Sequence, residues 1–295
     1  MFLVTGATGD LGHRIVRHLR SQEVPVRAFV QLTSHYGELE QRGAEIFIGD
    51  LREERDIQKA CQGVQYVVSA HGSNASTPGG VQALDYRANI NLIDAAKAAG
   101  AEHFVFTSVL GADRGYEDAP VFKAKWAIEQ YLRSVELNYT ILRPSGFASN
   151  LLPLAEQFRQ TGIYLLIGDP KTRTSIVSTD DLARIAAASP TTEGAINQVF
   201  SVGGPEILER ADIPKIFARV CKREPIVINP PLFALDGVRT ALGLINSDAR
   251  KALGTFRTLL ANEFFCTPNE VDRLETVFGF KLETLEAFLF RYLSA

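Results

Sequence analysis

The sequence predicts an α/β fold built on a doubly wound parallel sheet, and three observations support this prediction. Short apolar runs rich in β-branched and aromatic residues alternate with stretches of helical periodicity through the first half of the chain. The runs are almost continuously apolar, which is typical of parallel strands covered by helices on both faces. The length of 295 residues also suffices for one large or two modest domains with a substantial core.

The expected elements follow one another in a regular order. A first strand at 1–4 and a second at 26–30 flank a helix that begins near Leu11, which completes a βαβ unit. Four further strands and three further helices continue the alternation. The strands are expected at 44–48, 64–69, 103–107 and 139–142, and the helices at 53–61, 81–99 and 121–134.

The second half of the chain is less regular. Strand-like runs at 163–167, 174–177 and 199–202, together with a helix from Thr179, precede a mostly helical stretch beyond Arg210 and a bend at Asn229-Pro230-Pro231. We therefore expect residues 1–145 to form a nucleotide-binding core. Residues 146–295 should form a smaller, mostly helical substrate region that is partly interleaved with this core.

The composition excludes several classes of protein. A formal net charge of −3 offers no broad basic surface, so nucleic acid is not an expected partner. The cysteines Cys61, Cys221 and Cys266 are odd in number and far apart, which predicts neither a disulfide framework nor a metal site. No apolar run approaches the roughly 18 residues that span a bilayer, and no leader segment precedes the first strand. We expect a cytoplasmic protein without a transmembrane segment.

The strongest local signal is the segment Thr5-Gly6-Ala7-Thr8-Gly9-Asp10-Leu11-Gly12, where a strand ends and a helix begins. Gly6 permits a tight turn, Gly9 lets a pyrophosphate approach the backbone, and Gly12 lets the helix pack closely on the sheet. The amino terminus of this helix would then face the phosphates. The segment predicts a dinucleotide site.

The glycine spacing resembles that of the short-chain dehydrogenase/reductase superfamily, and the chain is most similar to its atypical NmrA-like branch. That branch includes isoflavone-reductase relatives and predicted sugar-nucleotide epimerases. The segments Gly49-Asp50-Leu51, Ser69-Ala70-His71, Thr107-Ser108, Lys125 with Glu129, and 142–147 agree with the same family. The resemblance implies a Rossmann-type fold. It also implies cofactor contacts at Gly6, Thr8, Gly9, Asp10, Leu11, Gly12, Gln31, Asp50, Leu51, Ser69, Ala70, His71, Lys125, Pro144 and Phe147.

One departure from the family pattern bears on catalysis. Standard members carry a Tyr four residues before the Lys, and Val121 occupies that position here. The usual Ser-Tyr-Lys proton relay therefore cannot operate. Lys125 could bond the ribose hydroxyls or act as an acid if burial lowers its pKa, and Ser108 could contact substrate or satisfy backbone groups. Tyr116 could enter the vacant position, although a loop role is favoured.

The choice of cofactor depends on the end of the second strand. Proteins that read NAD usually place an acid there, which accepts from the ribose hydroxyls and would repel a 2′-phosphate. No acid occurs between Val26 and Tyr36, so NADP is favoured and NAD remains possible. Thr33, Ser34 and Arg14 are candidate phosphate donors, and Gln31 stands where the family usually has Arg.

Three functions remain open. The leading hypothesis is an NAD(P)(H)-dependent oxidoreductase that transfers hydride to or from a small apolar carbonyl or enone, held near Phe147 and Asn150. The alternative is a dinucleotide-sensing protein without turnover that regulates a protein partner or supports assembly, and the missing Tyr favours it. Sugar-nucleotide epimerisation ranks third. The chain could be a monomer or a homodimer.

Overall fold

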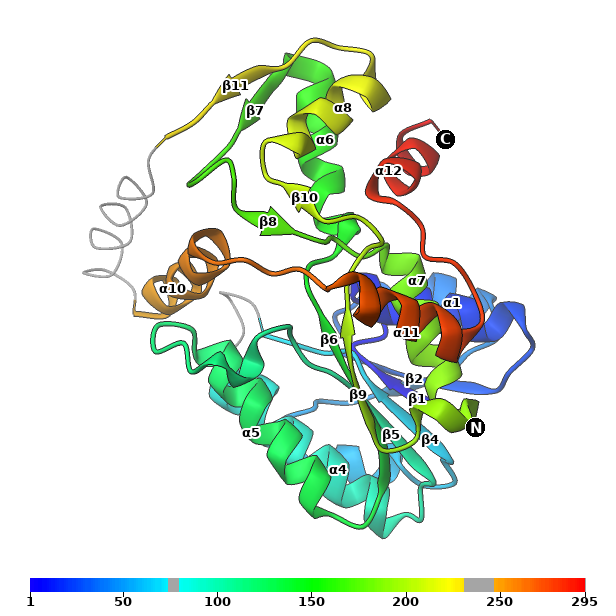
Figure 1. Cartoon of the computed structure of the whole chain (residues 1–295). Helices are drawn as coiled ribbons and strands as arrows, with labels where there is room; N and C mark the ends of the chain where they lie inside the picture. The colour runs from blue at the N-terminus through cyan, green and yellow to red at the C-terminus, as the bar shows by residue number, and fades with distance from the viewer. Residues whose placement is uncertain (74–79, 231–246, 295) are drawn as a thin grey trace. The chain divides into compact units, whose positions relative to one another are not determined.

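A seven-stranded sheet forms the centre of the first part of the molecule (Figure 1). The computed structural model describes residues 1–73, 80–230 and 247–294. The strand order is β3-β2-β1-β4-β5-β6-β9, and pairing is parallel from β3 through to β6. The strands are β1 (Phe2–Thr5), β2 (Val26–Val30), β3 (Glu45–Ile48), β4 (Tyr66–Ser69), β5 (His103–Thr107), β6 (Asn138–Pro144) and β9 (Gln198–Val202). The predicted doubly wound α/β fold is confirmed.

The helices lie on both faces of this sheet (Figure 1). On one face, α3 (Glu54–Ala60), α4 (Ala88–Ala98) and α5 (Pro120–Ser134) bury aliphatic side chains against the strands in one continuous core. On the other face lie α1 (Asp10–Ser21) and α7 (Thr179–Ala188), which arginine–aspartate pairs join. The strand order reverses between β1 and β4, and parallel sheets of this kind bind ligands at the carboxyl ends of the strands near such a reversal.

The observed elements differ from the expected ones in a few places. The helix expected at 81–99 divides into a π-helical stretch, η1 (Val81–Arg87), and α4. A short helix, α2 (Gly37–Gln41), was not expected. The strand expected at 174–177 reduces to β8 (Arg173–Thr174), and β7 (Ile163–Leu165) ends two residues earlier than expected.

Contacts divide the chain into two compact units. The first unit comprises Met1–Gly115, Val121–Arg143 and Asp180–Phe200, and the second comprises Tyr116–Pro120, Pro144–Thr179 and Ser201–Ala295. Helices α6 (Leu152–Thr161), α8 (Asp212–Cys221) and α12 (Leu285–Leu293) bring Phe158, Phe217 and Phe288 together in the core of the second unit.

The carboxyl-terminal region is mostly helical, as predicted. It adds α10 (Ser247–Ala261) and α11 (Pro268–Phe278), and its remaining strands are β10 (Leu208–Glu209) and β11 (Ile226–Ile228). β11 pairs with β7, and β10 pairs with β8. The bend predicted at Asn229-Pro230-Pro231 is described only in part, because Pro231 lies outside the described residues. Among the helices that are described, none is long and apolar enough to cross a membrane.

Candidate functional site

The segment from the end of β1 to the first turn of α1, residues 5–12, is here called the glycine loop. Its path depends on close contacts between backbone atoms. Gly6 adopts a φ of +67°, and a Cβ there would lie 2.7 Å from the Ala70 carbonyl oxygen. A Cβ on Gly12 would lie 2.1 Å from the Gly6 carbonyl oxygen. Both positions therefore exclude any side chain, because backbone atoms of the loop and of the segment after β4 already fill the space.

The amino terminus of α1 is open toward solvent. Thr8, Gly9 and Asp10 are exposed, and Gly9 is the residue before the helix, with no side-chain cap among the described residues. The first backbone N–H groups of a helix have no intrahelical acceptor, and the helix dipole adds partial positive charge there. A Cβ on Gly9 would meet only the Gly6 carbonyl oxygen, at 3.1 Å, so a larger side chain would extend into the space before the helix. This geometry fits a bound phosphate group.

The loop after β2 contains the residues that sequence reasoning proposed for cofactor choice. Gln31 and Thr33 are exposed, and the Ser34 backbone N–H closes a turn on the Gln31 carbonyl at 3.0 Å. Arg14 points elsewhere, since its guanidinium donates to Asp10 at 3.1 Å and to Asp180 at 2.6 Å. These two carboxylates compete with a phosphate for Arg14, which makes the exposed Gln31 turn the better candidate for a 2′-phosphate.

The segment after β3 is also polar at its tip. Asp50 is held by the backbone N–H and the guanidinium of Arg52, and the hydrogen bonds from Arg52 lower the pKa of the Asp50 carboxyl. Leu51 is buried. Asp50 is therefore a fixed anion just after β3, where the resemblance implies a cofactor contact.

His71, just after β4, is buried and only partly satisfied. Its Nδ1 lies 2.8 Å from the Thr5 hydroxyl and 3.3 Å from the Ser69 hydroxyl, whereas its Nε2 has no hydrogen-bond partner in the described structure. Burial, and next the charge of Lys125, lower the pKa of His71 to about 3, although the Leu84 carbonyl acts in the opposite direction. His71 is therefore neutral at physiological pH.

Lys125 lies on α5 with its ammonium buried. Nζ donates to the Thr107 carbonyl at 2.7 Å and lies 4.9 Å from the centre of the Phe106 ring. Burial lowers the pKa of Lys125, and the charges of Asp85 and Glu129 oppose that shift. An ammonium group has three donors, so this one retains capacity for a ligand.

Ser108 is turned toward the protein interior by Glu129. Its hydroxyl donates to Glu129 at 2.6 Å, and the Arg143 guanidinium holds both oxygens of the same carboxylate at 2.9 and 2.7 Å. Glu129 is fully buried, and Arg143 also pairs with Asp113 at 2.7 Å. Because Ser108 donates its proton to Glu129, it can offer only lone pairs to a substrate.

Two further residues of this region were missed by sequence reasoning. Asn89 accepts from the Ser69 hydroxyl at 2.6 Å and donates to the Asp85 carbonyl at 2.8 Å, and both side chains are buried. The Asp85 carboxylate accepts from the Ser73 backbone N–H at 3.1 Å. Asp85 and Asn89 are polar residues four positions apart in the helix expected at 81–99, and this spacing could have indicated a buried polar pair. The Lys125 cluster, as we define it, comprises Ser69, His71, Asp85, Asn89, Ser108, Lys125 and Glu129.

Two predicted cofactor residues belong to the second compact unit. Pro144 ends β6, and Phe147 forms an isolated parallel bridge with Val177, where the Ala148 N–H donates to the Val177 carbonyl at 2.9 Å. Tyr116 also lies in this unit and packs against Phe264 with ring centres 6.0 Å apart. The first unit thus contains the glycine loop and the Lys125 cluster, and these site assignments stay predictions.

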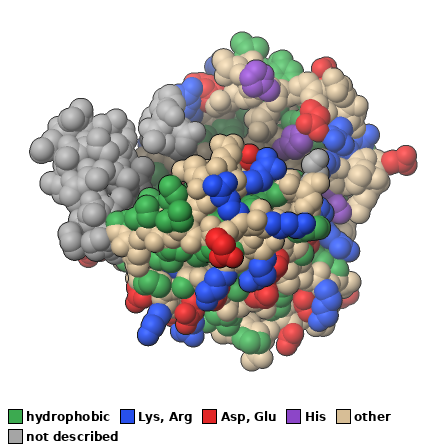
Figure 2. Space-filling model, turned by 90° about the horizontal axis from the view of Figure 1, so that it is seen from above, with side chains coloured by type: hydrophobic (Ala, Val, Ile, Leu, Met, Phe, Trp, Pro, Cys, Tyr) green, Lys and Arg blue, Asp and Glu red, His purple; other side chains and the backbone are tan. Residues whose placement is uncertain are grey.

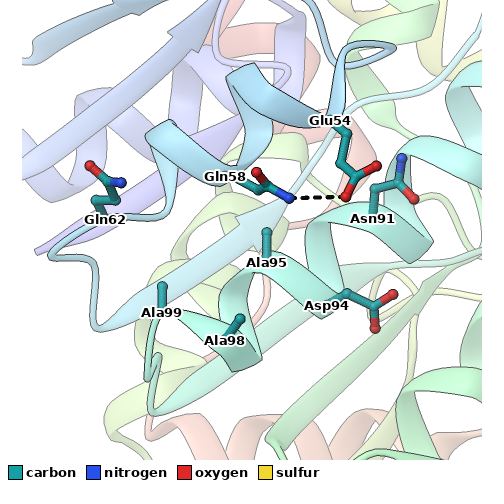
Figure 3. Close-up of a pocket in the computed structure, with 8 residues that line it drawn as sticks. All are labelled: Glu54, Gln58, Gln62, Asn91, Asp94, Ala95, Ala98 and Ala99. Carbon is teal, nitrogen blue, oxygen red and sulfur yellow. Dashed lines mark hydrogen bonds between the residues drawn. The ribbon is translucent and has the colours of Figure 1, made fainter.

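A groove between α3 and α4 contains none of the predicted site residues (Figure 3). It is lined by carboxylate and amide groups and by alanine methyl groups, and Gln58 donates to Glu54 at 2.9 Å. On the face in Figure 2, basic side chains are interspersed with acidic and apolar ones. Among the described residues, no group of His, Cys, Asp and Glu side chains is placed to hold a metal ion.

Comparison with known proteins agrees with the prediction of a dinucleotide site at the glycine loop. Residues 6–193 match the family described as NAD(P)H-binding. The chain is 29% identical to the photosystem II assembly factor Ycf39 of Cyanophora paradoxa over 300 residues, which cover 99% of this chain and 92% of that protein. It is 32% identical to the NAD(P)H azoreductase of Xenophilus azovorans over 250 residues, which cover 84% and 83%.

A solved structure shares the fold. The NADPH-dependent quinone oxidoreductase QOR2 of Escherichia coli, crystallised with NADPH, matches with a TM-score of 0.79 at 22% identity, and the match covers 100% of both chains. The family match spans residues 6–12 of the glycine loop, the Lys125 cluster and α7. The chain therefore belongs to the NAD(P)H-binding family, which agrees with the resemblance to atypical short-chain dehydrogenases/reductases.

Proposed function

We propose that this protein is an NADPH-dependent reductase in which Lys125 replaces the missing tyrosine as the proton donor. The observation that carries the proposal is the buried Lys125 ammonium, which makes a single described hydrogen bond, to a backbone carbonyl. Burial lowers its pKa, so the ammonium gives up a proton more readily than an exposed lysine does. The resemblance to an NAD(P)H azoreductase over most of both chains supports the reductase class.

The residues of the site divide the work. The glycine loop would hold the pyrophosphate through backbone N–H groups, and Lys125 would also reach the ribose hydroxyls. The chemistry that NADPH would supply when bound is hydride transfer, two electrons and a proton, to one atom of the substrate's double bond. Lys125 Nζ gives a proton to the other atom, which receives the π electron pair, and solvent then reprotonates the amine. Ser108, whose hydroxyl donates to Glu129, would line the substrate site without donating to the substrate.

The substrate proposed is a small, largely apolar molecule with a reducible carbonyl, enone, quinone or azo group. NADP is preferred over NAD because the exposed turn after β2 carries Gln31, Thr33 and Ser34 and no acid. A carboxylate at that position would repel a 2′-phosphate. Titration of the fluorescence of Trp126 with NADPH and NADH tests this preference, and equal affinity for the two would contradict it.

Single-turnover oxidation of bound NADPH against a panel of quinones, enones and azo dyes tests the chemistry. Lys125→Met should lower the rate by roughly 100-fold or more, because general acid catalysis contributes about 10²–10⁴. The wild-type rate should fall as pH rises through the lowered pKa of Lys125, and the variant should lose this dependence. Lys123→Met is the matched control, since Lys123 lies on the same helix and is exposed. An unchanged rate in Lys125→Met would remove Lys125 from the mechanism.

A second candidate is a dinucleotide-dependent assembly protein that does not turn over. The match to an assembly factor over 99% of this chain, together with Val121 in place of the tyrosine, favours it. The two candidates differ in the panel experiment. A protein that binds NADPH, reduces no member of the panel and captures a protein partner only when NADPH is bound would be the assembly protein.

A further inference from the structure

Asp85 is a buried carboxylate of the Lys125 cluster that the proposed function does not use. The residue lies on η1 and is 2% exposed, and its Oδ2 accepts from the Ser73 backbone N–H at 3.1 Å and from the Ser73 hydroxyl. Its Oδ1 accepts no hydrogen bond from the described residues. A carboxylate removed from water is costly unless a positive charge compensates it. Asp85 therefore needs a cation within the cluster.

Glu129, the second buried carboxylate of the cluster, already has its cation. The Arg143 guanidinium donates to both of its oxygens, at 2.9 and 2.7 Å. Arg133 adds a second positive charge 3.6 Å from one of these oxygens. The charge of Glu129 is therefore compensated by arginine.

Lys125 is a buried cation of the cluster without an ionic partner in contact. Its one described hydrogen bond goes to the uncharged Thr107 carbonyl. Burial lowers the pKa of Lys125, and of the two carboxylates that oppose this shift, Asp85 acts more strongly than Glu129. His71 also faces the ammonium, but it is neutral at physiological pH because burial lowers its pKa to about 3. Asp85 is therefore the carboxylate left to compensate Lys125.

Two hydrogen bonds hold η1 against the end of the sheet. Ser69, the last residue of β4, donates to Asn89 at 2.6 Å, and Asn89 donates to the Asp85 carbonyl at 2.8 Å. The Lys125 ammonium lies at the end of β5, the strand that pairs with β4. No hydrogen bond joins Asp85 to Lys125 in the described structure, so the carboxylate acts through space and leaves two ammonium donors unused.

We propose that Asp85 is the counter-ion of Lys125, a positioning residue whose buried negative charge keeps the ammonium protonated without occupying the donors that a ligand needs. This inference rests on the proposed reductase function, in which Lys125 gives a proton to the substrate. After that step the amine is neutral, and the uncompensated Asp85 carboxylate favours the return of a proton from solvent. Asp85 is assigned no contact with substrate or cofactor.

The pH dependence of single-turnover NADPH oxidation, with the panel member reduced fastest, tests this role. Asp85→Asn removes the charge and keeps an oxygen that accepts from Ser73. Its rate should fall off at a pH about one unit or more below the wild-type value, because a nearby opposite charge stabilises the charged form of a group by about 1–3 pKa units. Glu129→Gln should shift the fall-off less, since Arg143 compensates Glu129. Asp94→Asn is the matched control, because Asp94 is exposed on α4, and it should leave the fall-off unchanged.

A double-mutant cycle of Asp85→Asn and Lys125→Met tests the pair without any turnover. Each single variant leaves one buried charge without its counter-ion, whereas the double variant leaves neither. The thermal midpoint of the double variant, measured without ligand, should lie about 3 °C or more above the value expected from adding the two single losses. If Asp85→Asn does not fold, the double variant should restore folding. Asp94→Asn combined with Lys125→Met should be additive.

Two results would overturn the inference. One is a cycle in which the losses of Asp85→Asn and Lys125→Met add, which would assign Asp85 to structure through Ser73. The other is a fall-off at the wild-type pH in Asp85→Asn. If the wild type reduces no panel member and the cycle is not additive, the reductase proposal fails and Asp85 remains the counter-ion of Lys125. If the wild type turns over and the cycle is additive, the inference fails alone.

Discussion

The glycine loop and the Lys125 cluster belong to the same compact unit and lie at the ends of neighbouring strands, yet they are built in opposite ways. The loop consists of backbone whose shape depends on missing side chains at Gly6 and Gly12. The cluster consists of buried polar side chains, each positioned by a partner distant in sequence, such as Asn89 for Ser69 and Arg143 for Glu129. Added atoms should therefore damage the loop, and removed atoms should damage the cluster.

Gly9→Val should produce the largest effect. The added side chain would occupy the space before the amino terminus of α1, so NADPH affinity should fall at least about 100-fold. The fold should survive, because a Cβ there meets only the Gly6 carbonyl oxygen, at 3.1 Å. Fluorescence titration measures affinity, and the thermal midpoint without ligand checks folding.

Gly37→Val is the matched control for this substitution. Gly37 begins α2, and a Cβ there would have no heavy atom within 4 Å. Its NADPH affinity should equal that of wild type. If Gly9→Val also binds NADPH normally, the phosphate does not lie against the glycine loop, and the contrast between loop and cluster loses its functional meaning.

Glu129→Gln tests how far the Lys125 cluster depends on its buried charge. Unlike Gly9→Val, it removes a charge and adds no volume. The carboxylate is fully buried against Arg143 and Ser108, and removing one partner of a buried ion pair leaves the other charge poorly compensated. We expect a loss of about 2 kcal/mol in the free energy of unfolding, reduced because Asp113 still pairs with Arg143. Urea denaturation measures it, and NADPH affinity should change little.

Glu136→Gln provides the contrast for this variant. Glu136 is 97% exposed and lies 3.9 Å from Lys97, so its removal should cost less than about 0.5 kcal/mol. An equal effect of the two substitutions would mean that the buried network around Glu129 contributes no more than a surface pair. The cluster would then be less dependent on its partners than its geometry indicates.

The sequence was sufficient to predict the loop and the sheet. Three glycines at fixed spacing define a backbone path. The run 26–30, apolar except for Arg27, coincides with β2 because strands covered on both faces are mostly apolar. The short helix α2 escaped prediction. Its five residues carry one buried apolar side chain, Leu39, which is too few to show a helical period.

The cluster could be predicted only in part. Lys125 and Ser108 were identified by their resemblance to family positions, whereas Asp85 and Asn89 were not. Asn89 bonds Ser69 across 20 residues of sequence, and the π-helical turns of η1 alter which side chains face the sheet. A periodicity of 3.6 residues does not describe that stretch. The side chain of Arg14 was assigned to a phosphate, and its pairing with Asp180 depends on a contact between α1 and α7 that no local pattern encodes.

The smallest effect expected concerns acid stability, and it compares His103, at the start of β5, with His71, just after the neighbouring strand β4. His103 opens this strand, donates toward Thr140 at 2.9 Å and is buried, and desolvation lowers its pKa to about 4. An unfolded His takes up a proton near pH 6.5, so stability is complete above that pH and falls as pH drops toward 4. Between pH 7.5 and 5.5, His103 should cost about 1.4 kcal/mol, and His71 at the other end of the neighbouring strand should cost as much.

His103→Gln measures this contribution. The Gln amide keeps a hydrogen bond to Thr140 but cannot titrate, so the unfolding free energy of the variant should fall less between pH 7.5 and 5.5, by about 1.4 kcal/mol. His13→Gln is the control, because His13 is partly exposed beside Glu38 and belongs to neither buried pair. A wild-type pH dependence in His103→Gln would show that His103 is already protonated in the folded protein. The acid sensitivity would then have to come from other groups, such as His71 and His18, whose pKa values burial also lowers.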